Sequence, residues 1–263
     1  MDEAVAAFWA RAAETYETEV PYFRLMGERI VARAGLRAGE DVLDVACGKG
    51  ATLVPAARAV GDRGRVVGVD IVPEMVDAAR AAAADAGLAN VTVQVGDGDA
   101  LDIDSASFDV VVCGFGLGFL RPERALPEMR RVLRDGGHLV TSVPMGGGRD
   151  WDFFGELCKR YGLVSEAHVG GAAMPPFDEM AKLAASAGLF LDPPMAESVS
   201  VLFSDEESWW RWAWSHGQRA FLERLDDSQV DAFKEQAFAA LRSFRTSDGI
   251  PLEQQFLVLN ANT

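Results

Sequence analysis

Cysteine is scarce in this chain of 263 residues. Its three cysteines, Cys47, Cys113 and Cys158, lie far apart, and no two of them form a CxxC pair. This pattern argues against a disulfide framework and against a cysteine-based zinc site, and it fits a reducing compartment. We therefore expect neither a disulfide network nor a bound metal.

Basic residues are also few. The 25 lysines and arginines face 40 aspartates and glutamates, which gives a formal net charge of -15. A protein that binds duplex nucleic acid or an anionic membrane needs a positive face, and no basic run is long enough to supply one. Apolar runs fall short of the ~18 residues of a membrane span, and the first residues lack signal-peptide features. We expect a soluble cytoplasmic protein with neither nucleic-acid nor membrane partners.

Short apolar stretches alternate with helical patterns through the first half of the chain. Because strands that alternate with helices form parallel βαβ units, this pattern predicts an α/β fold. Stretches such as "VVV" (110–112), apolar on both faces, indicate a sheet covered by helices on both sides. The predicted strands are 41–46, 65–70, 90–95, 108–115, 138–144, 199–203 and 252–260.

The turn after the first strand, "VLDVACGKG", contains the most informative acid of the chain. Gly48 and Gly50 let backbone N–H groups approach a ligand, and Ala46 is nearly as small. Asp44 precedes these small residues, where a carboxylate repels a pyrophosphate but attracts an ammonium. With Leu53 in place of a third small residue, Asp44 disfavours a nicotinamide dehydrogenase and favours a cofactor that carries an amino acid.

Two further strands end in acids. Asp70 ends the second strand, where a carboxylate can accept both hydroxyls of a ribose. Asp97, next to Gly98, ends the third, where it can bind an adenine edge; the neighbouring Asp99 belongs either to this site or to a solvated acidic loop. Carboxyl ends of parallel strands share one edge of a sheet, so the three ends predict a nucleoside-amino acid site.

Five motifs follow one another between about residues 37 and 144: "VLDVACGKG", "VVGVDIVPEMV", "VGDGDAL", "SFDVVVCGFGLGFL" and "EMRRVLRDGGHLV". In them the chain resembles the class I S-adenosylmethionine-dependent methyltransferases. It is most similar to small-molecule enzymes of the ubiquinone and menaquinone type and of bacterial natural-product pathways. The resemblance implies a Rossmann-like, seven-stranded mixed sheet with an antiparallel last strand, helices on both faces and helical lid insertions.

We also expect a single domain, 1–263, whose segments have different roles. Residues 1–36 would form an N-terminal helical cap, 37–144 the cofactor-binding core, and 145–176 and 204–248 substrate-side insertions. The residues implied to hold S-adenosylmethionine are Tyr16, Asp44, Ala46, Gly48, Gly50, Asp70, Ile71, Asp97, Gly98 and Cys113. Ala46 departs from the usual glycine, and Gly118 stands where relatives often have a histidine, so no catalytic base can be transferred there.

Four of the six tryptophans lie in "SWWRWAWSHG", residues 208–217. At ~100° per residue, Trp209, Trp212 and His216 share one helix face, and Trp210 and Trp214 share another. We expect a capping box at 204–207 and a helix end at Gly217, which would place His216 where the helix dipole favours a protonated ring. Trp209 and Trp212 are candidates for the substrate pocket, with Phe115 as a third; packing of all four indoles is the equal alternative.

His216 and His168 are the candidate catalytic bases, although a structural role for each is the simpler alternative. Lys49 is expected to face solvent. The leading hypothesis is methyl transfer to an oxygen, nitrogen or carbon of a small, largely apolar or aromatic molecule. A base is needed only for a hydroxyl acceptor that must lose its proton. A cyclase or lyase that binds the cofactor without spending its methyl group is the alternative, a non-catalytic regulator is a third, and a homodimer is left open.

Overall fold

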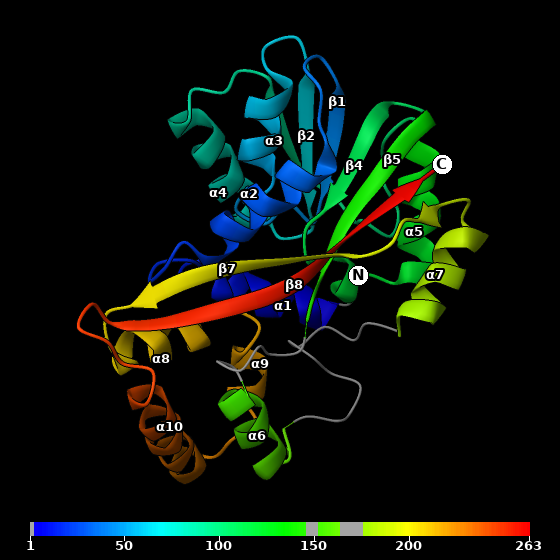
Figure 1. The fold of residues 1–263 in the computed structure, drawn as a ribbon. Coiled ribbons are helices and arrows are strands. Elements are labelled where there is room, and N and C mark those ends of the chain that lie inside the picture. Colours follow the sequence, from blue (N-terminus) through cyan, green and yellow to red (C-terminus); the bar gives the residue numbers. More distant parts are fainter. Residues whose placement is uncertain (1–2, 146–151, 164–175) are drawn as a thin grey trace.

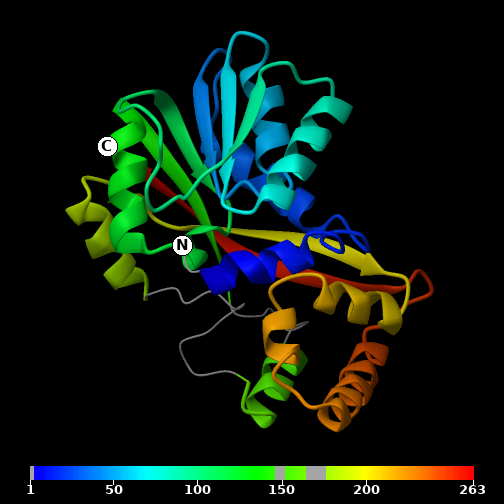
Figure 2. The same cartoon turned by 180° about the vertical axis from the view of Figure 1, so that it is seen from behind.

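The predicted alternation of strands and helices is present in the computed structural model, which describes residues 3–145, 152–163 and 176–263 (Figures 1 and 2). The strands are β1 (Asp41–Val45), β2 (Arg65–Asp70), β3 (Val91–Val95), β4 (Phe108–Cys113), β5 (Leu133–Pro144), β6 (Phe190–Leu191), β7 (Met195–Phe203) and β8 (Ile250–Asn262). The helices are α1 (Glu3–Ala12), α2 (Tyr22–Ala34), α3 (Leu53–Val60), α4 (Pro73–Asp85), the 3₁₀ turn η1 (Leu117–Phe119), α5 (Pro122–Val132), α6 (Asp152–Arg160), α7 (Phe177–Ser186), α8 (Glu206–Trp214), α9 (Arg219–Leu222) and α10 (Asp227–Arg242).

The sheet confirms the predicted fold class. Its strand order is β3-β2-β1-β4-β5-β8-β6, and β7 also pairs with β8. The first five strands are parallel, and β8 runs antiparallel to β5, as predicted for the last strand. Among the strands of the described residues, the sequence did not predict the two-residue β6, which pairs with the end of β8.

Alternate residues of the central strands pack under different helices. Val42 and Val110 belong to the apolar core that includes α2 and α3, whereas Leu43 and Val111 belong to the core under α5 and α7. Successive side chains of a strand point to opposite faces, so a strand that is apolar throughout must be covered on both sides. Both faces of the sheet are therefore buried, which leaves its edges and ends for ligands.

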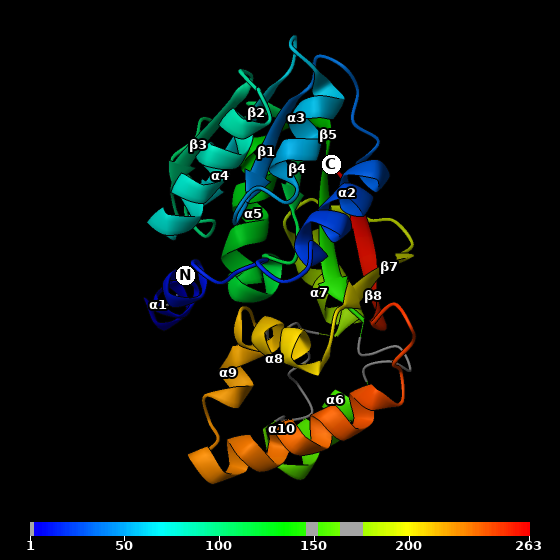
Figure 3. The same ribbon diagram turned by 90° about the vertical axis from the view of Figure 1, so that its left-hand side faces the viewer.

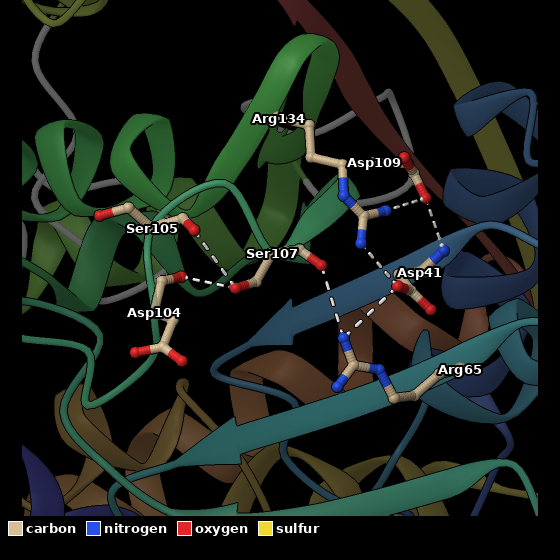
Figure 4. A network of polar contacts seen from close by, with 7 residues as sticks. All are labelled: Asp41, Arg65, Asp104, Ser105, Ser107, Asp109 and Arg134. Carbon is tan, nitrogen blue, oxygen red and sulfur yellow. Dashed lines mark hydrogen bonds and ion pairs between the residues drawn. The ribbon is translucent and has the colours of Figure 1, made fainter.

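A polar network joins the amino ends of four strands (Figure 4). Arg134 of β5 donates to Asp109 of β4 at 2.7 Å and to Asp41 of β1 at 2.8 Å. Arg65 of β2 approaches Asp41 at 3.4 Å, and the backbone N–H of Asp41 donates to Asp109 at 2.9 Å. Burial raises the pKa of Asp109, but the Arg134 and Asp41 hydrogen bonds outweigh it and the pKa is lowered. The amino ends are thus fastened to one another, away from the carboxyl ends.

A helical lobe lies beyond the sheet. α6, α8, α9 and α10 gather beneath the long antiparallel pair of β7 and β8 (Figures 1 and 3). The capping box of α8 is present but one residue later than predicted, because Asp205 rather than Ser204 accepts the Ser208 N–H, at 2.7 Å. The helix ends at Trp214 instead of Gly217, because the Ser215 N–H turns back to the Trp212 carbonyl at 3.0 Å.

Within the described ranges, no helix is long and apolar enough to cross a membrane. The same ranges contain no cluster of three histidine, cysteine or acidic side chains that could hold a metal ion. Residues 146–151 and 164–175 of the predicted first insertion, with His168, lie outside the described residues.

Candidate functional site

A cavity lies where the carboxyl ends of β1, β2 and β4 meet the N-terminal segment of α1, α2 and the loop between them. Six of the predicted site residues line it: Tyr16, Ala46, Gly48, Asp70, Ile71 and Phe115. They come from four separate segments of the chain, and the parallel topology brings them together at one edge of the sheet, as ligand sites in open α/β folds require.

The glycine-rich turn forms the floor of the cavity with an unusual backbone. Ala46, Gly48 and Gly50 all have positive φ, at 57°, 52° and 91°. The left-handed conformation costs little at glycine but is uncommon at alanine, and such strain concentrates at functional sites. Helix α2 packs directly on this turn because Gly27 has no side chain: a Cβ there would lie 2.1 Å from the Ala51 carbonyl oxygen. Gly27 lines the cavity, and we did not predict it from the sequence.

Asp44 lies fully buried beneath the turn. Its Oδ2 accepts the Thr52 hydroxyl at 2.6 Å, while Oδ1 has no hydrogen-bond partner among the described residues. Burial, only partly offset by the Thr52 hydrogen bond, raises the pKa of this carboxyl to about 7. A buried polar atom without a partner is costly, and a ligand ammonium would satisfy it. The site therefore fits the positive group of an amino-acid cofactor.

Asp70 connects two of the segments that line the cavity. Its Oδ2 accepts the Gly48 N–H at 2.9 Å, and its Oδ1 accepts the Val72 N–H at 3.0 Å. Burial raises the pKa of Asp70, and the hydrogen bonds from Val72 and Gly48 counteract that rise. Each carboxylate oxygen has a second acceptor site. Asp70 can thus hold the turn in place and still accept a ligand hydroxyl.

The end of β3 lies outside the lining of this cavity. Asp97 accepts the Asp99 N–H at 2.9 Å, and Gly98 is so close to Val45 that a Cβ would lie 2.8 Å from it. Asp99 is not in a solvated loop: it is buried and binds Arg121 through the backbone N–H at 2.9 Å and Nε at 2.8 Å. Contacts of Asp97 and Gly98 with an adenine remain a prediction, whereas the observed bonds assign Asp99 a structural role.

Aromatic side chains form the walls. Tyr16 stacks on Phe23, with ring centres 4.5 Å apart and an interplanar angle of 13°. Trp9 meets Tyr16 edge-on at 5.8 Å and Phe119 at 5.2 Å. Of these four residues that line the cavity, we predicted Tyr16 alone. Trp9 and Phe23 lie in segments with helical spacing, where an aromatic side chain indicates burial but not what it faces.

Phe115 extends the wall from the end of β4. Its φ of 58° is rare for a bulky residue, and its N–H donates to Ser142 Oγ at 3.0 Å. Its ring lies 5.5 Å from that of Phe256 in β8. Cys113, two residues earlier, is fully buried and does not line the cavity; burial raises the pKa of its thiol. Its predicted contact with the cofactor remains a prediction.

Lys49 was expected to face solvent, but it lies in the lining of the cavity. Its Nζ donates to the Tyr16 carbonyl at 3.0 Å and lies 5.8 Å from the centre of the Tyr16 ring. Burial lowers the pKa of Lys49, and the nearby Glu17 counteracts this. The lysine thus links the glycine-rich turn to the N-terminal segment.

The tryptophan-rich helix stands behind the wall. Trp209 and Trp212 are fully buried and do not line this cavity. Trp209 packs near Phe153 and Phe154, at 5.7 and 6.1 Å, and Trp212 lies 4.1 Å from the His216 ring. These are packing contacts, so the substrate role of both indoles remains a prediction.

His216 is buried and differs from expectation in its charge. Its Nδ1 lies 2.7 Å from the Trp212 carbonyl, and its ring lies 5.7 Å from that of Phe23 in the cavity wall. The prediction of a protonated ring is wrong, because burial lowers the pKa of His216 to about 4 against the opposing effect of the Trp212 carbonyl. Desolvation of a buried charge exceeds the modest stabilisation that a helix end can give.

Known proteins resemble this chain both in sequence and in fold. Residues 42–137 match a family model described as a methyltransferase domain. The chain is 34% identical over 236 residues to nocamycin O-methyltransferase from Saccharothrix syringae, an alignment that covers 82% of this chain and 83% of that protein.

Solved structures share the fold at low sequence identity. The YcgJ protein from Bacillus subtilis superposes with a TM-score of 0.61 at 18% identity, over 91% of this chain and 98% of that one. The cyclase SpnF superposes with a TM-score of 0.57 at 17% identity, over 91% of this chain and 81% of that one. At this identity, both likenesses concern the fold alone.

Proposed function

This chain belongs to the class I S-adenosylmethionine-dependent methyltransferases, and from that premise we propose that it methylates an oxygen of a small, largely apolar molecule of natural-product biosynthesis. Methyl transfer from S-adenosylmethionine to a small molecule follows from the family. The choice of oxygen, and of an acidic oxygen in particular, is our proposal. One observation carries it: the cavity at the carboxyl edge combines polar groups on its floor with walls that are almost wholly apolar.

The floor suits the cofactor. The unpartnered Oδ1 of buried Asp44 would accept the cofactor ammonium, and Ala46, Gly48 and Gly50 would let its amino-acid part approach the backbone. Asp70 would accept the ribose hydroxyls, and Ile71 would pack on the adenine. Tyr16 would cover the cofactor from the N-terminal side. The contacts of Asp97, Gly98 and Cys113 belong to the same proposal.

The acceptor would lie against Phe115, Phe23 and Ile30, which line the cavity alongside the glycine-rich turn. When bound, S-adenosylmethionine supplies an electrophilic methyl group on a positively charged sulfur. The apolar side chains exclude water and hold the acceptor in line with that group, and positioning of this kind can supply a large part of the rate. We propose that Trp209 and Trp212 support this wall from behind and that one of them contacts the acceptor.

Among the described residues that line the cavity, no side chain is suited to take a proton from the acceptor, which favours an acidic acceptor. Burial raises the pKa of Tyr16 and of Cys47, so neither takes up a proton at neutral pH. Lys49 donates to the Tyr16 carbonyl, and Asp70 already accepts two N–H groups. A carboxylic acid or an acidic enol is ionised without a protein base, and the apolar walls favour a reaction in which opposite charges cancel. The name of the relative, an O-methyltransferase, also supports oxygen.

The test is turnover with four matched sets of acceptors of similar size: aryl carboxylic acids, acidic enols, simple phenols or alcohols, and amines. We expect release of S-adenosylhomocysteine and a one-methyl mass gain with an acidic set, with kcat/KM nearly independent of pH above the acceptor's own pKa. Phenols should react only as they ionise. Methylation of amines alone would contradict the proposal.

The same assay separates the cyclase alternative, which the shared fold with SpnF keeps in view. A cyclase would convert its substrate with bound cofactor and release no S-adenosylhomocysteine. Calorimetry with S-adenosylmethionine addresses the non-catalytic alternative, because a regulator that has lost the cofactor would give no binding heat.

A further inference from the structure

Lys49 occupies a position that the proposed reaction does not use. Among the described residues that line the cavity it is the single basic side chain. It stands between Gly48 and Gly50, in the turn that forms the cavity floor. Of the three N–H bonds of its ammonium, the hydrogen bond to the Tyr16 carbonyl, at 3.0 Å, accounts for one.

The charges around this ammonium are complementary to an amino acid. Asp44, five positions earlier near the end of β1, has a buried oxygen without a hydrogen-bond partner among the described residues, and this oxygen is suited to an ammonium. Asp70 adds a second carboxylate to the site. The buried carboxylate of Asp44 beneath the turn and the ammonium of Lys49 in the cavity lining are therefore complementary to the two charges of the cofactor's amino-acid part, its ammonium and its carboxylate. Opposite charges are paired in such an arrangement and no like charges need to meet.

We propose that Lys49 binds the carboxylate of the cofactor's amino-acid part, opposite the ammonium site at Asp44, and transmits this contact to the N-terminal segment through the Tyr16 carbonyl. The inference rests on S-adenosylmethionine as cofactor and not on the identity of the acceptor. The ammonium and the carboxylate of the cofactor's amino acid would then both bind one six-residue stretch of chain, from Asp44 to Lys49.

An anionic acceptor is the competing partner for Lys49, and the position of the lysine argues against it. A cation beside the reacting methyl would repel the sulfonium and weaken the electrophile's binding. Lys49 instead lies on the floor with the glycine-rich turn, and its hydrogen bond leads to Tyr16 of the covering segment rather than to Phe115 at the end of β4.

Binding measurements test the assignment without any turnover. Two ligands are compared by calorimetry: S-adenosylhomocysteine, which has the amino-acid group, and 5′-methylthioadenosine, which has the same nucleoside and sulfur but lacks it. For Lys49→Met we expect the affinity for S-adenosylhomocysteine to fall about 10- to 100-fold, the worth of a charge-assisted hydrogen bond. The affinity for 5′-methylthioadenosine should change less than about 2-fold, because that ligand offers no carboxylate.

A third ligand separates the two charges of the amino acid. The butanoate thioether of adenosine keeps the carboxylate at the same distance from sulfur and lacks the ammonium, so Lys49→Met should weaken its binding while Asp44→Asn should not. Lys49→Arg should retain part of the affinity, and it provides a folded variant if Lys49→Met is unstable. Lys159→Met, which removes an exposed ammonium of α6, controls for the change in net charge.

Two results would overturn the proposal. Equal weakening of all three ligands by Lys49→Met would mean that the lysine acts only by holding the Tyr16 segment. Unchanged affinity for S-adenosylhomocysteine, with a higher KM for the acceptor alone, would assign Lys49 to the acceptor. Neither result depends on whether the acceptor is an acidic oxygen, so failure here is distinct from failure of the proposed function.

Discussion

Replacing Asp44 with asparagine should stabilise the ligand-free protein while it weakens cofactor binding. The carboxyl is fully buried, one of its oxygens has no partner among the described residues, and its pKa is about 7 instead of 3.8. Between these values the unfolded chain has released a proton that the folded protein still holds. Stability therefore falls as pH rises from about 4 to 7, at about 1.4 kcal/mol per pH unit. Above pH 7 the ionised carboxylate costs about 4 kcal/mol.

Asparagine removes this cost because it has no charge, and its amide oxygen can still accept the Thr52 hydroxyl. Its NH₂ group would be buried without a partner, at about 1–3 kcal/mol, so the net gain at pH 8 should be about 1–3 kcal/mol. At pH 4, where Asp44 is protonated in the folded state, the variant should be equal to the parent or less stable. The difference between the two proteins should thus move by about 4 kcal/mol across this range.

Urea unfolding of both proteins at pH 4, 5, 6, 7 and 8, without ligand, measures this directly. Asp85→Asn, at an exposed aspartate of α4, controls for the loss of a carboxylate. A stability difference that stays constant across the series would refute the reasoning, since a buried charge must register in the pH dependence. Calorimetry should also show that S-adenosylhomocysteine binding near pH 6 releases a proton in the parent but not in the variant.

Three further outcomes follow from the packing and the charges. Gly27→Ala should destabilise the protein by about 1–3 kcal/mol and weaken cofactor binding, because its Cβ would overlap the glycine-rich turn. In urea unfolding the control Gly155→Ala, inside α6 where a Cβ meets nothing within 4 Å, should stabilise the protein by up to about 1 kcal/mol. Arg134→Met should cost about 1 kcal/mol or less of stability at low salt and leave the affinity for S-adenosylhomocysteine unchanged. The pKa of Asp109 is lowered in the folded protein, so its ion pair stabilises the fold at neutral pH and this contribution is lost as pH falls. An equal loss of stability in high salt would contradict an ion-pair origin. His216→Phe should keep kcat within about 3-fold with the same pH profile, whereas a drop of about 100-fold or more would restore the histidine as a base.

Asp44 illustrates a cost that ligand binding can explain. The ligand-free protein holds a buried carboxyl with one oxygen unsatisfied, which reduces its stability. An ammonium at that oxygen would pair the charge and favour ionisation, so the destabilising residue becomes part of the binding energy. The left-handed Ala46 and Phe115 at the same cavity are strained in a comparable way. Strain that persists at several points of one cavity is typical of binding sites.

Much of the site was predictable because it lies in short segments with regular geometry. The period of the apolar residues specifies strands, and parallel strands place their carboxyl ends at one edge. Asp44 and Asp70 at strand ends, with small residues between, therefore indicated a cofactor site from spacing alone. The motif order identified the family, and the antiparallel β8 followed from it.

The tertiary structure decided which buried side chains face the cavity. Helical spacing marked both the tryptophan-rich helix and α2 as buried, yet Phe23 lines the cavity and Trp209 and Trp212 do not. A periodic pattern reports that a face is covered and carries no information on what covers it. Helix α2 docks on the glycine-rich turn through Gly27, and this contact places Phe23 in the cavity wall.

The sequence by itself determined the order of strands and helices, the family and the placement of Asp44 and Asp70 at strand ends, because these depend on neighbours along the chain. Only the tertiary structure decided the charges and partners of the remaining groups. Burial in the folded protein lowers the pKa of His216, and the approach of the N-terminal segment brings Lys49 into the cavity lining. Desolvation and long-range contact depend on what the fold brings near, which no local spacing records.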